Sequence, residues 1–135
     1  MSRNGKAHPD ILLSHAAPDA ALAEAVKERL TDAGMTVAVP PTDFRKPDYP
    51  SKLRRALARS RAYVPIVSRS FVDDPRLLLE GGAAWARSLP VYLLRNDIPG
   101  EDIPVFFHRF RSFPLWHDLP RLIKKLGQPT WKVPA

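Results

Sequence analysis

The chain has 135 residues, of which 44% are hydrophobic and 26% charged, the composition of one ordinary globular domain and not of a disordered chain. It contains no cysteine, which excludes disulfides and thiolate metal sites. Every apolar run is short and ends at a charge, a proline or a glycine, so no run has the length of a membrane span. The first ten residues are polar and lack an apolar secretory core, so we expect a cytoplasmic protein.

The formal net charge is +7, from 21 Lys and Arg against 14 Asp and Glu. Such an excess attracts polyanions, so nucleic acid, an anionic nucleotide and an acidic protein all stay open as partners. The basic residues of 52–61 avoid Leu53 and Leu57, which favours a solvated helix surface over a binding site. The basic residues gather in three groups: Lys52, Arg54, Arg55, Arg59 and Arg61; His108, Arg109 and Arg111; and Arg121, Lys124 and Lys125.

Short apolar runs of strand length alternate along the chain with segments of helical period. In chain order we predict a strand over 10–14, a helix over 18–33, a strand over 36–39, a helix over 51–60, a strand over 62–68, a helix over 77–88, a strand over 90–94, a weaker strand over 111–115 and a helix over 118–126. We expect residues 1–9 and 128–135 to be loose ends around one domain over 10–127.

Several residues mark the boundaries of these elements. Gly34 is the expected C′ residue of the first helix, and Ser51 is the expected N-cap of the second. The stretch from Pro40 to Pro50 contains four prolines and should be an irregular loop. Pro65 lies within the third strand, where it cannot donate a ladder hydrogen bond, so a bulge or an unpaired position is expected there.

Continuously apolar strands are typical of a parallel sheet that helices cover on both faces. Strict alternation of strands and helices implies right-handed crossovers and a doubly wound sheet. We therefore predict an α/β, flavodoxin-like fold with five parallel strands in the order 2-1-3-4-5. Ligands of such sheets bind beyond the strand ends where the order reverses, here between the first and third strands. Ser14 and His15, and the segment 68–80, should reach this crevice.

Most ready-made chemistries are excluded by the residues present. There is no Gly-rich phosphate loop, no cysteine nucleophile and no HExxH motif, and the four histidines (His8, His15, His108 and His117) match no metal-ligand spacing. We therefore expect neither a metal nor a bound cofactor, and carboxylates near the crevice become the candidates.

Glu80 is the main candidate, in the first turn of the predicted third helix and near the mouth of the crevice. Gly81 and Gly82 follow it, and each costs a helix roughly 1 kcal/mol relative to alanine, so close approach to the sheet or room for a ligand is expected. Glu80 can equally be a first-turn acid paired with Arg76. Trp85 falls on the apolar face of this helix and is expected in the core.

The order of six segments, one of which contains Glu80, resembles a TIR (Toll/interleukin-1 receptor) domain of bacterial type over residues 10–126. The segments are Ile11-Leu12-Leu13-Ser14-His15, Gly34-Met35-Thr36-Val37, Leu57-Ala58-Arg59-Ser60-Arg61, Ile66-Val67-Ser68, and Glu80-Gly81-Gly82-Ala83-Ala84-Trp85-Ala86 with Leu89-Pro90-Val91 after it. TIR domains have the five-stranded flavodoxin-like fold predicted above.

The resemblance implies an enzyme that cleaves the nicotinamide–ribose bond of NAD, as a glycohydrolase or a cyclase, with NAD as substrate and no separate cofactor. Glu80 matches the family's catalytic glutamate, and Ser14 and His15 match the segment that lines the nicotinamide end of the site. Phe44 and Tyr49 lie in the loop similar to the family's mobile BB loop, where an aromatic ring can stack on a base. Arg76 completes the set of expected substrate contacts.

Three departures from the family pattern bear on substrate affinity. Arg76 stands where the family commonly has an aromatic residue, often Trp. The loop carries Pro47-Asp48 where Pro-Gly is common, and Ala16 follows His15 in place of a charged or aromatic residue. The fold does not depend on these positions.

The resemblance implies an effector or signal generator in bacterial immune defence, acting with self-association or with other TIR domains. A non-enzymatic TIR scaffold that joins partners through homotypic contacts is the alternative. A nucleic-acid-binding module is disfavoured by the apparent lack of surface aromatics between the basic residues. A nucleoside ribosyltransferase-like enzyme would use the same fold and a comparable carboxylate.

Overall fold

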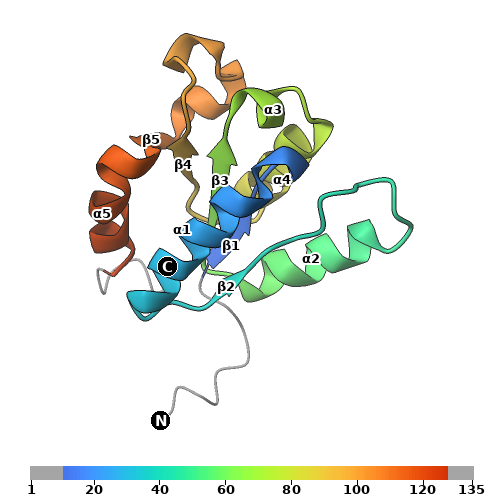
Figure 1. Ribbon diagram of the computed structural model, residues 1–135. Helices are drawn as coiled ribbons and strands as arrows, with labels where there is room; N and C mark the ends of the chain where they lie inside the picture. Colours follow the sequence, from blue (N-terminus) through green and yellow to red (C-terminus); the bar gives the residue numbers. More distant parts are fainter. Residues whose placement is uncertain (1–10, 128–135) are drawn as a thin grey trace.

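The computed structural model describes residues 11–127, which form a five-stranded parallel sheet in the order β2-β1-β3-β4-β5 (Figure 1). This order confirms the predicted flavodoxin-like fold. Asp10 and the expected loose ends 1–9 and 128–135 lie outside the described residues. The strands are β1 (Ile11–Ser14), β2 (Val37–Ala38), β3 (Ala62–Val67), β4 (Tyr92–Arg95) and β5 (Arg111–Pro114).

Helical segments connect the strands, with α1 in front of β1 and α4 behind it in Figure 1. Within residues 11–127 the sequence predicts four of the five α-helices and misses the short α3. The Ser68 side chain caps α3 by accepting a hydrogen bond from the Phe71 amide at 3.2 Å. The helices are α1 (Ala20–Asp32), α2 (Tyr49–Arg59), α3 (Arg69–Val72), α4 (Pro75–Ala86) and α5 (Leu115–Leu126), and the 3-10 turns are η2 (Ala17–Asp19), η3 (Gly100–Asp102) and η4 (Val105–Arg109).

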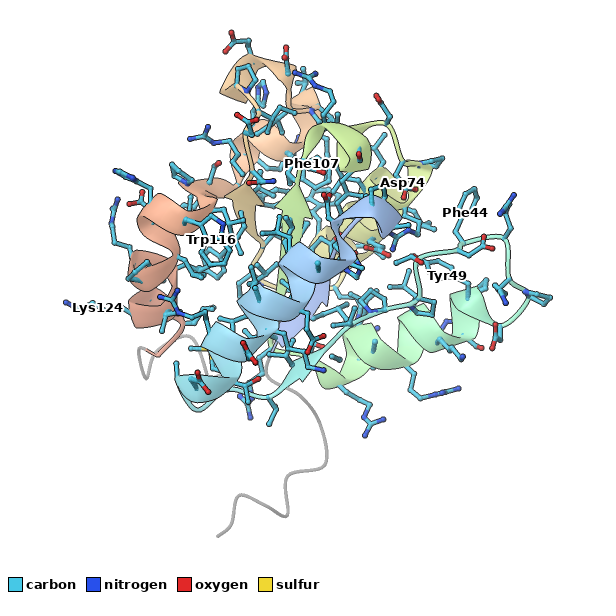
Figure 2. The ribbon with its side chains drawn as sticks, in the orientation of Figure 1. Phe44, Tyr49, Asp74, Phe107, Trp116 and Lys124 are labelled. Carbon is cyan, nitrogen blue, oxygen red and sulfur yellow. The ribbon has the colours of Figure 1, made fainter. Side chains whose placement is uncertain are left out.

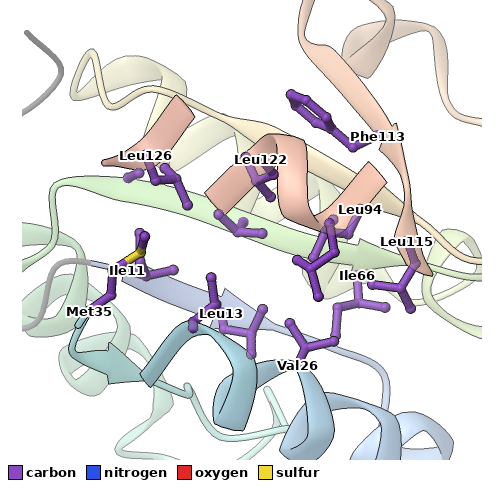
Figure 3. Close-up of a cluster of buried hydrophobic side chains, with 14 of the residues drawn as sticks. Ile11, Leu13, Val26, Met35, Ile66, Leu94, Phe113, Leu115, Leu122 and Leu126 are labelled. Atoms are coloured by element: carbon purple, nitrogen blue, oxygen red, sulfur yellow. The ribbon is translucent and has the colours of Figure 1, made fainter. Parts of the chain in front are cut away.

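Each face of the sheet is covered by its own set of helices. On one face, α1 and α5 pack against the strands around Ile11, Leu13 and Ile66 (Figure 3). On the other face, α2, α3, α4 and η4 pack around Leu12 and Tyr63. Since successive side chains of a strand point to opposite faces, Ser14 lies on the same face as Leu12, toward α2 and α4.

Three helices, α2, α4 and α5, begin earlier than predicted. The second helix begins at Tyr49, with Asp48 as its N-cap residue and Pro50 in its first turn, so Ser51 is not the N-cap. The last helix begins at Leu115 and runs through Pro120, because its buried leucine stripe continues on both sides of that proline. Gly34 follows the C-cap of α1 with φ of 94°, the left-handed conformation that favours glycine and that its sequence position predicts.

Pro65 lies in the central strand, where it stands opposite Ser14 of β1. On the β4 side the ladder is interrupted: Tyr63 pairs with Val91 and Ile66 pairs with Leu94, with the same register on both sides of the gap. The expected unpaired position is therefore present, and no residue is inserted as in a bulge.

Trp85 is not in the core, contrary to the sequence prediction. Its side chain is 52% exposed, and Leu78 on the same helix is 53% exposed. The Trp85 ring contacts the edge of Phe106, with ring centroids 5.9 Å apart, and the Arg109 guanidinium lies 5.6 Å from the Trp85 ring centre. The face of α4 that points toward the sheet instead carries Leu77, Glu80 and Ala84.

Candidate functional site

Glu80 lies in the second turn of α4, because the helix begins at Pro75 and not at Leu77 as predicted. Asp74 caps this helix, accepting a hydrogen bond from the Arg76 amide at 2.9 Å. Its start at Pro75 turns Arg76, Leu77 and Glu80 inward together. Glu80 is fully buried, with an exposed fraction of 0%.

Four side chains donate hydrogen bonds to the Glu80 carboxylate. Oε1 accepts from the Ser14 hydroxyl and, at 3.0 Å, from the Tyr63 hydroxyl. Oε2 accepts from the Tyr49 hydroxyl at 2.5 Å and from Arg76 Nη1 at 3.2 Å. Each carboxylate oxygen therefore accepts two hydrogen bonds, which replace those that water would make to an exposed carboxylate.

These partners come from elements that are far apart in the sequence. Ser14 is the last residue of β1, Tyr63 belongs to the neighbouring strand β3, and Tyr49 is the first residue of α2. The carboxylate of Glu80 therefore lies against the sheet face at the boundary of β1 and β3. The fold places this acid at the topological switch point, where ligands of doubly wound sheets bind.

Arg76 is fully buried beside Glu80, with which it forms an ion pair one helical turn apart. Its guanidinium also donates to the backbone carbonyl of His15 and, at 3.0 Å, to that of Pro41. A fourth interaction joins it to Asp74 Oδ2 at 3.3 Å. Arg76 thus ties the end of β1 and the loop after β2 to α4, and the sequence-based alternative of an Arg76–Glu80 pair is confirmed.

His15 lies next to this pair and is 6% exposed. Its Nδ1 is buried and has no hydrogen-bond partner among the described residues. Burial lowers the pKa of His15 below its ordinary 6.5, and the nearby charge of Arg76 lowers it further, while Asp19 acts in the opposite direction. The folded state therefore favours the neutral imidazole.

Burial raises the pKa of Glu80 above its ordinary value, since the ionised carboxylate loses contact with water. The hydrogen bonds from Ser14 and Tyr49, then the charge of Arg76 and the Tyr63 hydroxyl, oppose this effect. Burial and the Glu80 charge raise the pKa of both tyrosines, so they stay protonated and act as donors.

The carboxylate is closed to solvent, contrary to the expected open crevice. Tyr49 from α2 and Arg76 from α4 cover Oε2, and both side chains are almost completely buried. The two glycines after Glu80 make no room for a ligand beside it. A Cβ on Gly81 would lie 2.5 Å from Cε1 of Phe107, so Gly81 permits close approach of η4 and not of the sheet, and Gly82 faces open space.

The structure brings together Ser14, Tyr49, Arg76 and Glu80 of the predicted site residues, with His15 beside them. Phe44 stands apart: it is 42% exposed on the loop that leads into α2 (Figure 2). Tyr49 was predicted in that loop but belongs to the helix. The loop contributes to the site through the carbonyl of Pro41.

Sequence reasoning misses Tyr63, which reads as one more apolar residue of a buried strand. That its hydroxyl binds Glu80 follows only from the packing of α4 against β3. It also misses the contact of Ser68 Oγ with Asp19 Oδ2, at 2.5 Å, which joins the segments after β3 and β1. The spacing of 49 residues between the two gives no local signal.

Two further properties follow from the described part of the chain. Within residues 11–127, no three His, Asp or Glu side chains come together as a metal ion would require. No helix in this range has the length and hydrophobicity needed to cross a membrane.

The described residues thus form a doubly wound α/β domain with a buried, hydrogen-bonded glutamate at the switch point of its sheet. The family model of the TIR domain matches residues 11–123, and the chain belongs to this family. The search among curated proteins found no match.

Proposed function

We propose that this TIR domain cleaves NAD at the bond between nicotinamide and ribose, with Glu80 as the catalytic residue. The observation that carries the proposal is the burial of the Glu80 carboxylate among four side-chain donors at the switch point of the sheet. A buried ion pair is weak support for stability, because removing two charges from water costs as much as their attraction returns. Perturbed carboxylates of this kind cluster at functional sites.

The chemistry requires one carboxylate. As the bond from C1′ to the pyridinium nitrogen breaks, its electron pair stays with nicotinamide and positive charge develops on the ribose as an oxocarbenium-like state. Glu80 would stabilise that charge in a site without bulk water. Water then adds at C1′ and loses a proton, giving ADP-ribose, or a group of the same molecule closes a cyclic product.

In this proposal Arg76 and Tyr49 also keep the resting site closed. Both side chains donate hydrogen bonds to Oε2. The ribose can therefore reach Glu80 only after they move away, together with the start of α2 and the segment around Pro41. Once released, Arg76 would supply a positive charge for the diphosphate of NAD, which Arg binds well through its planar fork. The isolated domain is then a resting state with low activity.

Self-association would complete such a site, since Phe44 lies exposed on the loop beside it. A neighbouring subunit that contacts this loop in a head-to-tail manner would build open filaments and not closed dimers. This assembly suits an effector or signal generator in a bacterial immune response.

A non-enzymatic scaffold is the second candidate, and it is favoured by the solvent-free carboxylate and by a surface cluster in which Trp85 and Arg109 are exposed and Phe106 is half-buried. The sequence predicts no aromatic ring among the basic residues at the surface, but the exposed Trp85 ring does lie beside Arg109. Trp85 is therefore an exposed ring on which a nucleic-acid base could stack.

Incubation of the purified domain with NAD at high concentration, with products resolved by mass, separates these functions. The proposal predicts free nicotinamide with ADP-ribose or a cyclic isomer. A ribosyltransferase would transfer the ribosyl group only when a second base is supplied. Intact NAD at the highest protein concentration, with the domain folded and assembled, would exclude NAD cleavage and favour the non-enzymatic scaffold.

A further inference from the structure

A groove of about 410 Å³ lies between α2 and α4, beside the group around Glu80. Leu53 and Leu57 of α2 and Leu79 and Ala83 of α4 form much of its wall. Its volume falls in the range of pockets for small ligands, about 300–1,000 Å³. Leu79 is 49% exposed, so an apolar ligand in the groove would remove that side chain from water.

Charge on the groove has one sign. Arg54 from α2 and Arg87 from the end of α4 are exposed, and both belong to the lining. Among the described residues, no acidic side chain lines the groove. An apolar wall with arginines at its edge is complementary to an apolar chain that ends in an anion, because a guanidinium binds a carboxylate through two parallel hydrogen bonds.

We propose that this groove binds an aliphatic carboxylate, with the chain along Leu53, Leu57 and Leu79 and the carboxylate at Arg54 and Arg87. The chain excludes water from the leucines, which stabilises the complex in proportion to the apolar area covered. The inference does not depend on NAD cleavage. Tyr49 lines the groove as well as donating to Glu80, so the two sites are neighbours that share one side chain.

The test uses dodecanoate as probe, below the concentration at which it forms micelles, with binding to the full chain followed by calorimetry. Octanoate, decanoate and dodecanoate should bind with increasing affinity, by up to about fourfold for each added methylene, since one buried CH₂ contributes about 0.8 kcal/mol. Dodecanol, which lacks the charge, should bind at least tenfold more weakly. Equal binding of dodecanol, or no binding of dodecanoate, would overturn the proposal.

Neighbouring residues provide matched controls. Leu78 and Leu79 are 53% and 49% exposed on the same helix, but only Leu79 lines the groove. Leu79→Glu should abolish dodecanoate binding, and Leu78→Glu should leave it unchanged. Equal losses in both variants would overturn the assignment.

The same comparison is possible on α2. Arg54 and Arg55 are both exposed, but only Arg54 lines the groove. Arg54→Glu should weaken dodecanoate binding at least tenfold while Arg55→Glu changes it less than threefold, with folding of all variants checked by circular dichroism.

A dimer of the wild type that Leu79→Glu dissociates, with no dodecanoate bound, would assign the groove to a second copy of the chain and overturn the proposal.

Discussion

Arg76 and Glu80 lie one turn apart on α4 and form an ion pair, Nη1 to Oε2 at 3.2 Å, in which both side chains are fully buried. Each ion depends on the other, because a buried charge without a partner costs several kcal/mol. The pair also fixes the surrounding loops, since Arg76 donates to the carbonyls of His15 and Pro41. Stability and the resting state of the site therefore depend on the same contact.

Arg76→Met should lower the free energy of unfolding by about 3–5 kcal/mol, because it removes the counter-ion of the buried Glu80 carboxylate. Urea denaturation at pH 7 measures this change. The double variant Arg76→Met/Glu80→Gln should lose less than the sum of the two single changes, with a coupling of about 0.5–3 kcal/mol.

The control for that experiment is Arg55→Met, an exposed arginine of α2 whose replacement should stay within about 0.5 kcal/mol of the wild type. A loss below about 1 kcal/mol in Arg76→Met would contradict the account of a mutually dependent buried pair.

The fold could be predicted because its signals are local. Apolar runs such as 62–68 and the leucine period of α1 specify strands and helices without reference to the rest of the chain, and the alternation sets the strand order. The group around Glu80 could be predicted only in part. Ser14 and Glu80 follow from the topology, whereas Tyr63 and the inward turn of Arg76 depend on how α4 packs on the sheet.

Helix boundaries explain two of the wrong predictions. Placing the start of α4 at Leu77 put Glu80 in the first turn, but the cap at Asp74 moves the start to Pro75. The wrong placement of Trp85 has another cause, because Trp85 shares the face of Leu78, and that face of α4 is exposed. Placing the start of α2 at Ser51 left Tyr49 in the loop. An aspartate cap with proline at the first or second helical position is the signal that would have corrected both.

Gly81→Ala and Gly82→Ala form a matched pair one residue apart on α4. A Cβ at Gly81 would overlap the ring of Phe107, which is fully buried, so Gly81→Ala should destabilise the domain by about 1–3 kcal/mol. A Cβ at Gly82 meets nothing within 4 Å, so Gly82→Ala should stabilise the domain by up to about 1 kcal/mol through helix propensity.

Thermal unfolding of the two glycine variants measures these changes in opposite directions. If both substitutions stabilise the domain, the close approach of η4 to α4 is incorrect.

The titration of His15 should occur below pH 6.5, because burial and then the charge of Arg76 lower its pKa. A lowered pKa contributes stability that is present above the unfolded value and lost as the pH falls through the folded value. The free energy of unfolding should therefore fall on acidification below about pH 6.5, and less so in His15→Gln. Glu80, whose pKa is raised, is present in both the wild type and His15→Gln, so the difference between their pH profiles of stability reports on His15 alone.

Nuclear magnetic resonance of the His15 ring gives the midpoint directly. A midpoint at or above 6.5 would show that the imidazole is not desolvated as the structure has it.

Specific activity on NAD should rise with protein concentration if assembly completes the site. The net charge of +7 opposes crowding of identical subunits, so added salt should favour the assembled form by screening it. Phe44→Ser should blunt the rise, since this exposed ring lies on the loop beside the site. Tyr49 is unsuited to this purpose because its hydroxyl binds Glu80. Flat specific activity with a monomer throughout by light scattering would remove assembly from the proposal.

The central claim is tested most directly by the rate of nicotinamide release from NAD in the wild type, Glu80→Gln and Glu101→Gln, at one concentration of assembled protein. Glu80→Gln keeps size and removes the charge that would oppose the oxocarbenium state, so it should reduce the rate at least a hundredfold, the scale of a lost electrostatic group, while circular dichroism shows the same fold. Glu101 is exposed in η3, and its replacement should leave the rate unchanged. A Glu80→Gln protein that releases nicotinamide within a few-fold of the wild type would contradict the assignment of Glu80 as the catalytic residue.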